Sequence, residues 1–223
     1  MIEAKKFHLF EKGFAVYLFP LMRRSFSHFL GQNIRKIPQQ PAIFIANHSS
    51  WWDGLLFFFL NRTVWKHDIH MMMHEKNLKT YKFFRYLGAF SIDKQKPKDI
   101  IRSLQYAEEL LKQGKSVVLF PQGDEFHQEI RPLVFNNGIG YLLEKHPEVS
   151  VIPITFYYSF RHEQKPEVWI HQGPSLPIEE IPGTSRKEKS GFLQQFMTEQ
   201  LDELKQKVIA ENTAPFKDLL RKE

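Results

Sequence analysis

The chain contains no cysteine among its 223 residues. Disulfides, thiolate metal sites and a cysteine nucleophile are therefore excluded, and the composition suits a reducing cytoplasm. The sequence also lacks any apolar run near the roughly 18 residues that a membrane-spanning helix needs. Its N-terminus lacks a charged region followed by a clean apolar stretch and a small-residue cleavage site, so we expect no secretory signal. Any use of lipids is then expected at the membrane surface.

The chain is rich in positive charge and in phenylalanine. Its formal net charge is +6 at pH 7, and it contains 21 phenylalanines. A basic balance fits anionic lipid headgroups, an acidic carrier protein or nucleic acid. No recognisable nucleic-acid motif accompanies the charge, so we predict no nucleic-acid partner. Phenylalanine clusters pack a core or mark a membrane interface, depending on where they lie.

Predicted strands and helices alternate along most of the chain. Short apolar runs predict strands at 42–47, 68–74, 90–92, 116–120, 149–159 and 168–170. Helices are predicted at 52–61, 76–86, 97–113 and 137–145, and a long C-terminal helix follows a loop at 173–184 that is rich in proline and glycine. This alternation predicts a single-domain α/β fold, with a mixed sheet flanked by helices.

The N-terminal segment is predicted to be helical and amphipathic over residues 3–30. Pro20 should kink or end the first helix. Cations such as Lys5 and Arg24 punctuate its phenylalanines. The segment either packs on the domain as a core helix or lies in the headgroup plane with its cations outward, and its basic, phenylalanine-rich character favours the second. We therefore divide the chain into membrane-associating helices at 1–30 and a globular domain at 31–223, joined by a polar connector at 31–40.

A histidine and an aspartate stand five residues apart where a predicted strand ends. His48 and Asp53 follow the apolar run 43–46, and residues 54–60 predict the first turns of a buried helix. Open α/β sheets place their ligands at this carboxyl end of the strands. A carboxylate that holds one imidazole nitrogen fixes the ring in the tautomer of a general base. The alternative is that Asp53 simply caps the helix.

Four sequence blocks together resemble one family. Residues 46–54 read Ala-Asn-His-Ser-Ser-Trp-Trp-Asp-Gly. The pattern Asn-His-x-Ser-x-x-Asp after an apolar strand resembles the first block of the glycerolipid acyltransferase superfamily, of the 1-acyl-sn-glycerol-3-phosphate acyltransferase-like (lysophospholipid acyltransferase) type. Blocks at 88–94, 118–125 and 151–155 resemble the second, third and fourth, in the family's order. Each block alone is a weak motif, and their succession is specific.

The resemblance implies a glycerol-3-phosphate acyltransferase-like fold and an O-acyltransferase. Such an enzyme moves a fatty acyl group from acyl-CoA or acyl carrier protein to the hydroxyl of a lipid acceptor of the lysophosphatidate type. His48 is then the catalytic base and Asp53 orients it, with backbone amides near Gly123 and Trp51 as candidate oxyanion donors. No resident cofactor is implied, since the acyl thioester is a co-substrate. We expect a peripheral protein on the cytoplasmic face of the cell membrane.

Two blocks depart from the family's pattern. Lys94 stands where the second block usually ends in arginine, and residues 120–125 read Phe-Pro-Gln-Gly-Asp-Glu in place of the usual Phe-Pro-Glu-Gly-Thr-Arg. The candidates for substrate binding are therefore Lys94, Gln122, Gly123 and Arg131. Arg131 either folds back as a substitute cation or is a surface charge. Gly123 is expected to permit a tight turn and a close backbone approach.

The departure leaves the acceptor open. Asp124 and Glu125 would repel a phosphate dianion, but they could accept hydrogen bonds from sugar or glycerol hydroxyls. The alternative function is therefore acyl transfer to an acceptor without phosphate, such as a glycolipid or another lipid alcohol. An alternative of another class is a non-catalytic protein that binds acyl lipids. The intact His48 and Asp53 argue against that reading.

The histidines also allow a metal hypothesis. His70 and His74 have the i, i+4 spacing that suits zinc on a helix, and His67 and His127 could join them. Residues 69–73 are apolar, however, and predict a strand, which would place His70 and His74 about 13 Å apart. The family resemblance implies no metal. We therefore predict none.

Overall fold

Short apolar runs become the strands of one eight-stranded sheet in the computed structural model, which describes residues 1–37 and 41–221. The strands are β1 (Phe29–Gln32), β2 (Ala42–Ala46), β3 (Ile69–His74), β4 (Ala89–Ile92), β5 (Ser116–Leu119), β6 (Ser150–Ser159), β7 (Glu167–Gln172) and β8 (Lys217–Asp218). Their order is β4-β3-β5-β2-β6-β7-β1-β8. The β6–β7 and β1–β8 pairs are antiparallel and the other pairs are parallel, which confirms the predicted mixed α/β sheet.

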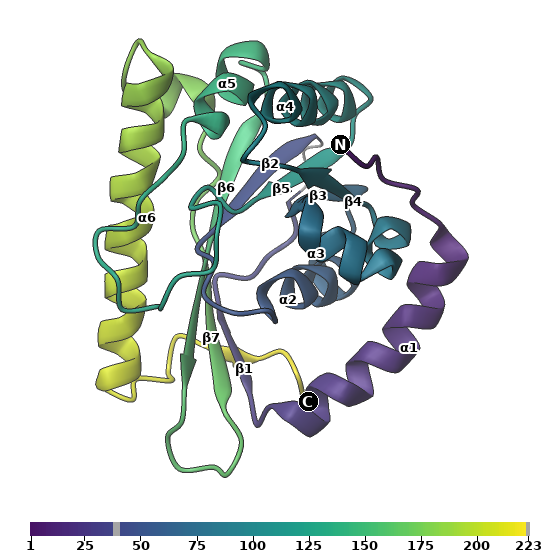
Figure 1. Cartoon of the computed structure of the whole chain (residues 1–223). Coiled ribbons are helices and arrows are strands. Elements are labelled where there is room, and N and C mark those ends of the chain that lie inside the picture. Colours follow the sequence, from purple (N-terminus) through teal and green to yellow (C-terminus); the bar gives the residue numbers. More distant parts are fainter. Residues whose placement is uncertain (38–40, 222–223) are drawn as a thin grey trace.

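Helices cover both faces of this sheet (Figure 1). They are α1 (His8–Ser25), α2 (Asp53–Leu60), α3 (Glu75–Thr80), α4 (Pro97–Lys112), α5 (Gly138–Lys145) and α6 (Arg186–Ile209). A π-helical turn at Asn61–Trp65 and 3₁₀ helices at Lys82–Leu87 and Ile178–Glu180 complete the set. The predicted helix at 76–86 is therefore two short helices, α3 and the 3₁₀ helix that follows it.

The alternation of side chains along β2 divides the core in two. Phe44 packs with residues of α1 and α2 on one face, whereas Ile43 and Ile45 pack with residues of α4, α5 and α6 on the other. All five residues of β2 are buried, because parallel strands covered on both faces have no solvent side. The carboxyl ends of β2, β3, β4 and β5 then meet at one edge of the sheet, where the predicted site lies.

The N-terminal segment differs from the helix predicted over 3–30. Residues before His8 are extended: the amide of Ser91 in β4 donates to the carbonyl of Ile2 at 2.8 Å, and the amide of Lys5 to that of Arg85 at 2.9 Å. The helix α1 continues through Pro20 and ends at Ser25. Its start and end therefore fall several residues inside the predicted range.

The strand β1 is the second correction in this region. Residues 29–32 were expected to be helix end and connector, yet they pair in parallel with β7 and antiparallel with β8. Phe29 is fully buried. The backbone groups of β1 find hydrogen-bond partners in the strands on either side, β7 and β8. A boundary at residue 30 falls inside this strand. Residues 38–40 of the expected connector lie outside the described part of the chain.

Two histidines in the sheet have depressed pKa values. Burial lowers the pKa of His70, on β3, to about 4, and nearby Lys6 acts in the same direction. Burial also lowers the pKa of His171, on β7, to about 4. In the unfolded chain both have the ordinary value of 6.5. Between these pH values the unfolded chain binds protons that the folded protein does not. The contribution of the two histidines to the free energy of unfolding is therefore fully present above pH ~6.5 and is lost as the pH falls toward 4.

We therefore expect the free energy of unfolding, measured by urea titration, to be lower at pH 5 than at pH 7. Replacing His70 by glutamine removes one of the two groups, so the difference between the two pH values should shrink. The control is His127→Gln, because the side chain of His127 is exposed and lies outside the sheet. An unchanged pH difference in His70→Gln would contradict the assignment.

Candidate active site

Asn47 determines how the chain leaves the sheet at the end of β2. The backbone pairing of β2 with β6 ends at Ala46 opposite Ile154. Beyond it the Asn47 side chain takes over: its Nδ2 donates to the carbonyl of Phe156 at 3.0 Å, and its Oδ1 accepts the Phe156 amide at 2.9 Å. One buried amide side chain thus replaces a peptide group in the ladder. The backbone is free to turn away, and it presents His48 at the sheet edge.

Backbone contacts from the loop after β5 fix His48. Its amide donates to Oε1 of Gln122 at 2.9 Å, and its carbonyl accepts the amide of Phe126 at 2.9 Å. Its ring stacks on Phe120 with 4.3 Å between the ring centroids. The predicted third block therefore lies directly against the predicted first block. Gln122 uses its side-chain oxygen to hold the histidine backbone, and its expected contact with substrate stays a prediction.

Asp53 begins helix α2 and its side chain is fully buried. Its Oδ2 accepts hydrogen bonds from Nδ1 of His48 at 2.8 Å and from the amides of Ser49 and Ser50 at 2.8 and 2.9 Å. An ionised carboxylate can only accept, so the imidazole proton is assigned to Nδ1. The other ring nitrogen, Nε2, then carries a lone pair that can take a proton.

Tyr158 completes the surroundings of Asp53 and was not singled out in the sequence. Its hydroxyl donates to Oδ1 of Asp53 at 2.6 Å. Burial, reinforced by the negative charge of Asp53, raises the pKa of Tyr158 well above its usual value, so the hydroxyl keeps its proton. Gln128 holds the Tyr158 backbone through two hydrogen bonds of 2.9 Å. No local sequence signal pointed to this contact, because 105 residues separate Tyr158 from Asp53.

The turn of the third block needs the glycine at position 123. Gly123 has φ of 80°, and a Cβ there would lie 2.7 Å from Nδ2 of Asn136. Its amide donates to the carbonyl of Phe120 at 2.9 Å, so this amide is not free to serve as an oxyanion donor as expected. Its carbonyl accepts Nζ of Lys94 at 2.6 Å. Gly123 and Lys94 therefore lie together, as their blocks suggested.

The two acids of the third block face different partners. Oδ2 of Asp124 lies 2.5 Å from Nζ of Lys94. Oε1 of Glu125 lies 3.7 Å from Nε2 of His48, the nitrogen that Asp53 leaves free. The side chains of Asp124 and Glu125 are 62% and 45% exposed, so both reach solvent. The reactive nitrogen of His48 thus has a carboxylate on its open side.

Arg131 does not fold back toward His48. Its Nε donates to Oδ1 of Asp202 on α6 at 2.6 Å, and its Nη1 donates to the carbonyls of Gln128 and Ile130 at 2.6 and 3.0 Å. These bonds tie the loop to α6. Of the two readings left open by the sequence, neither a substitute cation nor a free surface charge describes it. The structure thus shows Arg131 as a link between this loop and α6, and its part in substrate binding stays a prediction.

A cavity of about 1690 Å³ opens beside His48. This volume exceeds the 300–1,000 Å³ of a typical small-ligand pocket, so a long chain fits. Apolar side chains from β3, β4, α4 and α5 line much of it, including Met71, Met73, Ile92, Leu104 and Ile139. Lys94, Gly123, Asp124 and Glu125 stand at the same cavity. Asp53 lies behind His48, outside the lining.

The histidines of the metal hypothesis have other contacts. His67 lies 2.9 Å from Oγ of Ser116 and 2.7 Å from the carbonyl of Ile37. Nδ1 of His74 accepts the amide of Lys76 at 3.1 Å. Over residues 1–37 and 41–221, no three side chains of the usual ligand types gather into a candidate metal site. Over the same residues, no helix combines the length and apolar character needed to cross a bilayer.

Comparisons with known proteins show a family and a similar fold. A family model described as Acyltransferase matches residues 28–157, which is more than half of the chain. The crystal structure of the 1-acyl-sn-glycerophosphate (LPA) acyltransferase PlsC from Thermotoga maritima is similar in fold, with a TM-score of 0.65 and 20% sequence identity. The match covers 89% of this chain and 79% of that one. No curated protein matches the chain significantly.

The Asn47 bridge generates a stability prediction. Asn47→Ala leaves the amide and carbonyl of Phe156 buried without partners, which should lower the free energy of unfolding by about 2–5 kcal/mol. Asn137→Ala is the matched control, because this exposed side chain makes no capping hydrogen bond and should change stability by less than about 0.5 kcal/mol. Urea unfolding of both variants measures the difference. Equal stabilities would show that the bridge contributes nothing.

Proposed function

The chain belongs to the acyltransferase family, and from this premise we propose that it transfers a fatty acyl group from a thioester to a hydroxyl group of a lipid. The observation that carries the proposal is the hydrogen-bonded pair His48–Asp53, whose His48 lines a large, mainly apolar cavity. A base at this position meets a reacting hydroxyl, while the cavity has room for a fatty chain. Both requirements of the reaction are met by neighbouring residues.

The proposed reaction needs no covalent enzyme intermediate. Nε2 of His48 takes the proton of the acceptor hydroxyl as its oxygen attacks the thioester carbonyl carbon. The tetrahedral intermediate collapses, the carbon–sulfur bond breaks, and the imidazolium returns the proton to the departing thiolate. Asp53 keeps the ring in the required tautomer and offsets its transient positive charge. Ser50 is not the nucleophile in this scheme, since its hydroxyl accepts the amide of Trp52 at 3.2 Å.

The donor is an acyl thioester of coenzyme A or of acyl carrier protein, acting as co-substrate beside no resident cofactor. The net positive charge of the chain suits either, because both carry negative charge. The apolar lining from Met71 to Met73 fits a fatty chain of the donor. The family resemblance implies a lysophosphatidate-type acceptor and a place in phospholipid synthesis. A non-catalytic lipid binder would have no use for the ordered His48–Asp53 hydrogen bond.

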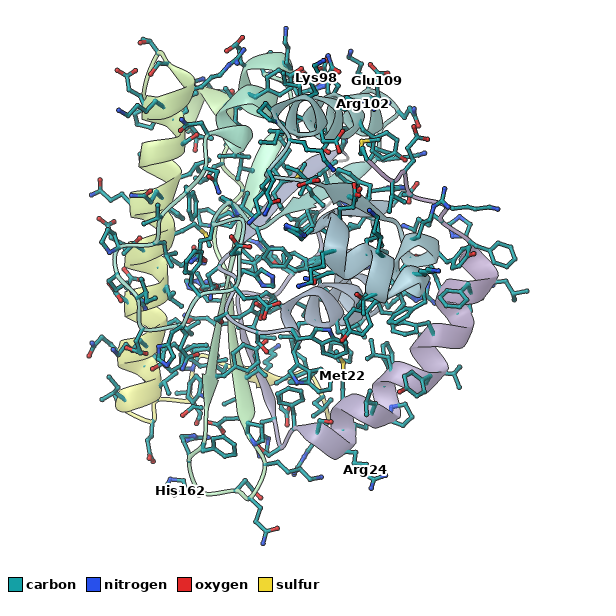
Figure 2. All side chains as sticks on the ribbon, viewed as in Figure 1. Met22, Arg24, Lys98, Arg102, Glu109 and His162 are labelled. Atoms are coloured by element: carbon teal, nitrogen blue, oxygen red, sulfur yellow. The ribbon has the colours of Figure 1, made fainter. Side chains whose placement is uncertain are left out.

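The outer face of α1 supports contact with a membrane. Phe7, Leu9, Val16 and Tyr17 are between 56% and 77% exposed, whereas Met22 is buried against the domain. Arg24 points away from the domain at the end of the helix, and Met22 points toward it (Figure 2). Exposed apolar and basic side chains on one helix face suit an anionic lipid surface. The helix thus combines both predicted roles, with one face packed and the other free.

This arrangement favours a peripheral protein on the cytoplasmic face of the cell membrane. Lys6, another cation of the N-terminal segment, does not face outward: it is paired with Asp68 at 2.7 Å and lies near Glu11. The exposed cations of α1 are Lys12, Arg23 and Arg24. Deleting residues 1–30 would remove the buried Leu18 and Phe29, so point substitutions test the membrane contact better.

The first functional prediction concerns the base. His48→Ala should lower the rate of acyl transfer by about 10²–10⁴-fold, since the hydroxyl loses its proton acceptor. Transfer from acyl-CoA to a panel of lipid alcohols, followed by mass spectrometry, measures the loss. Circular dichroism and urea unfolding check that the fold persists. Near-normal turnover in His48→Ala would refute the assignment.

Graded variants distinguish the roles around His48. Asp53→Asn should lose a large share of activity but less than His48→Ala. Tyr158→Phe removes the 2.6 Å hydrogen bond to Asp53, and a single bond to a charged group corresponds to about a tenfold loss in rate. Tyr157→Phe is the matched control, because its hydroxyl binds Glu129 instead. Equal rates for Tyr158→Phe and Tyr157→Phe would remove Tyr158 from the mechanism.

The second functional prediction concerns α1. Lys12→Glu combined with Arg24→Glu should weaken binding to vesicles that contain anionic lipid by about tenfold or more, as each cation near the surface contributes about 1 kcal/mol. Sedimentation with liposomes at low and high salt measures it, and salt should weaken the wild-type interaction.

The control makes the same charge change on another helix. Lys98→Glu with Arg102→Glu alters α4, where both side chains project away from the sheet (Figure 2). If this pair weakens vesicle binding as much as the α1 pair, overall charge and not α1 explains the interaction.

A further inference from the structure

The acceptor headgroup must lie beside the third block. In the proposed reaction, the hydroxyl that gives up its proton sits within hydrogen-bond reach of Nε2 of His48. Glu125 is the side chain on the open side of this nitrogen, with Oε1 at 3.7 Å. Whatever group is attached next to the reacting hydroxyl therefore meets the carboxylate of Glu125, and the exposed carboxylate of Asp124 is its sequence neighbour.

Lys94 already has two bonding partners within the protein. Its Nζ contacts Oδ2 of Asp124 at 2.5 Å and the carbonyl of Gly123 at 2.6 Å. A phosphate at this position would have to compete with both. Asp124 also cancels the formal charge of Lys94. The lysine therefore supports the loop that carries Glu125, and it presents no unbalanced positive charge to a headgroup.

The two arginines near the site, Arg131 and Arg186, also have carboxylate partners within the protein. Arg131 binds Asp202 on α6. Arg186, which also lines the cavity, forms two hydrogen bonds with Glu144, at 2.6 and 2.9 Å. The remaining lysines of the lining, Lys76 and Lys187, begin α3 and α6 and do not belong to the loop that holds His48. No bidentate arginine–phosphate contact is thus prepared beside His48 within the described residues.

We propose that the acceptor carries an uncharged, hydroxyl-rich headgroup, glyceryl or glycosyl, and that Glu125 selects it. This inference rests on the acyl transfer proposed above. A hydroxyl next to the reacting one donates to the carboxylate of Glu125 in a charge-assisted hydrogen bond. A phosphate dianion in the same place meets a like charge with no balancing cation. The carboxylate therefore favours neutral polyols and disfavours lysophosphatidate.

A competition assay tests the headgroup. Lysophosphatidate, a monoacylglycerol and a monoglycosyl lipid are offered at equal concentration in neutral vesicles, with one acyl-CoA as donor. Mass spectrometry measures the acylated products. We expect one of the neutral acceptors to exceed lysophosphatidate by about tenfold or more, given an exposed carboxylate near the headgroup. The product ratio of the two neutral arms distinguishes a glyceryl from a glycosyl headgroup.

Variants at position 125 test the cause. Glu125→Gln keeps the size and removes the charge, so lysophosphatidate should gain relative to the neutral acceptor. Glu125→Arg adds a cation and should shift the ratio further, because arginine matches phosphate geometry. Glu109→Gln is the control: this residue lies on the outer side of α4, and its replacement should leave the ratio unchanged (Figure 2).

Two outcomes would overturn the inference. The first is a strong wild-type preference for lysophosphatidate that is lost in Lys76→Ala or Lys94→Ala, which would assign phosphate binding to those cations. The second is a product ratio that does not respond to Glu125→Gln and Glu125→Arg. Failure of the acyl transfer itself has a different signature: no acceptor is acylated in a His48-dependent manner, and both proposals then fall.

Discussion

The buried carboxylate of Asp53 is the constraint on which the candidate site depends. An unpaired charge in a protein core is very costly, so its position requires donors on all sides. Asp53 receives four: Nδ1 of His48, the amides of Ser49 and Ser50, and the Tyr158 hydroxyl. Three of these hydrogen bonds reach Oδ2 and one reaches Oδ1, so both carboxylate oxygens are paired. The connection from β2 to α2 thus folds around the Asp53 carboxylate, and the hydrogen bond from Nδ1 of His48 to this carboxylate sets the orientation of the imidazole.

Amide side chains extend this order into the neighbouring loops. After β2 leaves the sheet, the edge of β6 still exposes peptide groups at positions 156 and 158. Asn47 pairs with the first and Gln128 with the second, each through one donated and one accepted hydrogen bond. Side-chain amides carry the same two groups as a peptide, so they continue the ladder without a strand. The loop after β5 is therefore fixed to the sheet, and Gln122 in that loop holds the backbone of His48. The site is rigid because two loops substitute for missing strand neighbours.

The sequence predicted what depends on local order and missed what depends on distant partners. The His48–Asp53 pair could be found because five residues separate its members and both follow an apolar strand. Tyr158 lies 105 residues from Asp53, and no local pattern connects them. Arg131 was recognisable as a cation, but its partner Asp202 lies 71 residues further on a helix face that composition does not orient. The strand β1 was missed for the same reason. Its four residues follow an amphipathic helix, and they form a strand only because β7 and β8 pair with them.

The position of Glu125 joins acceptor choice to the chemistry of the base. In the proposed reaction, positive charge develops on the imidazole of His48 as the hydroxyl proton arrives. Asp53 lies on one side of the ring at 2.8 Å and Glu125 on the other at 3.7 Å, so two carboxylates flank that charge. Preorganised charges of opposite sign stabilise a transition state when they already stand where charge develops. The third block of the family usually has an arginine at this position, which suits a phosphate acceptor. The carboxylate of Glu125 suits a neutral acceptor instead, and at this position it serves binding and proton transfer together.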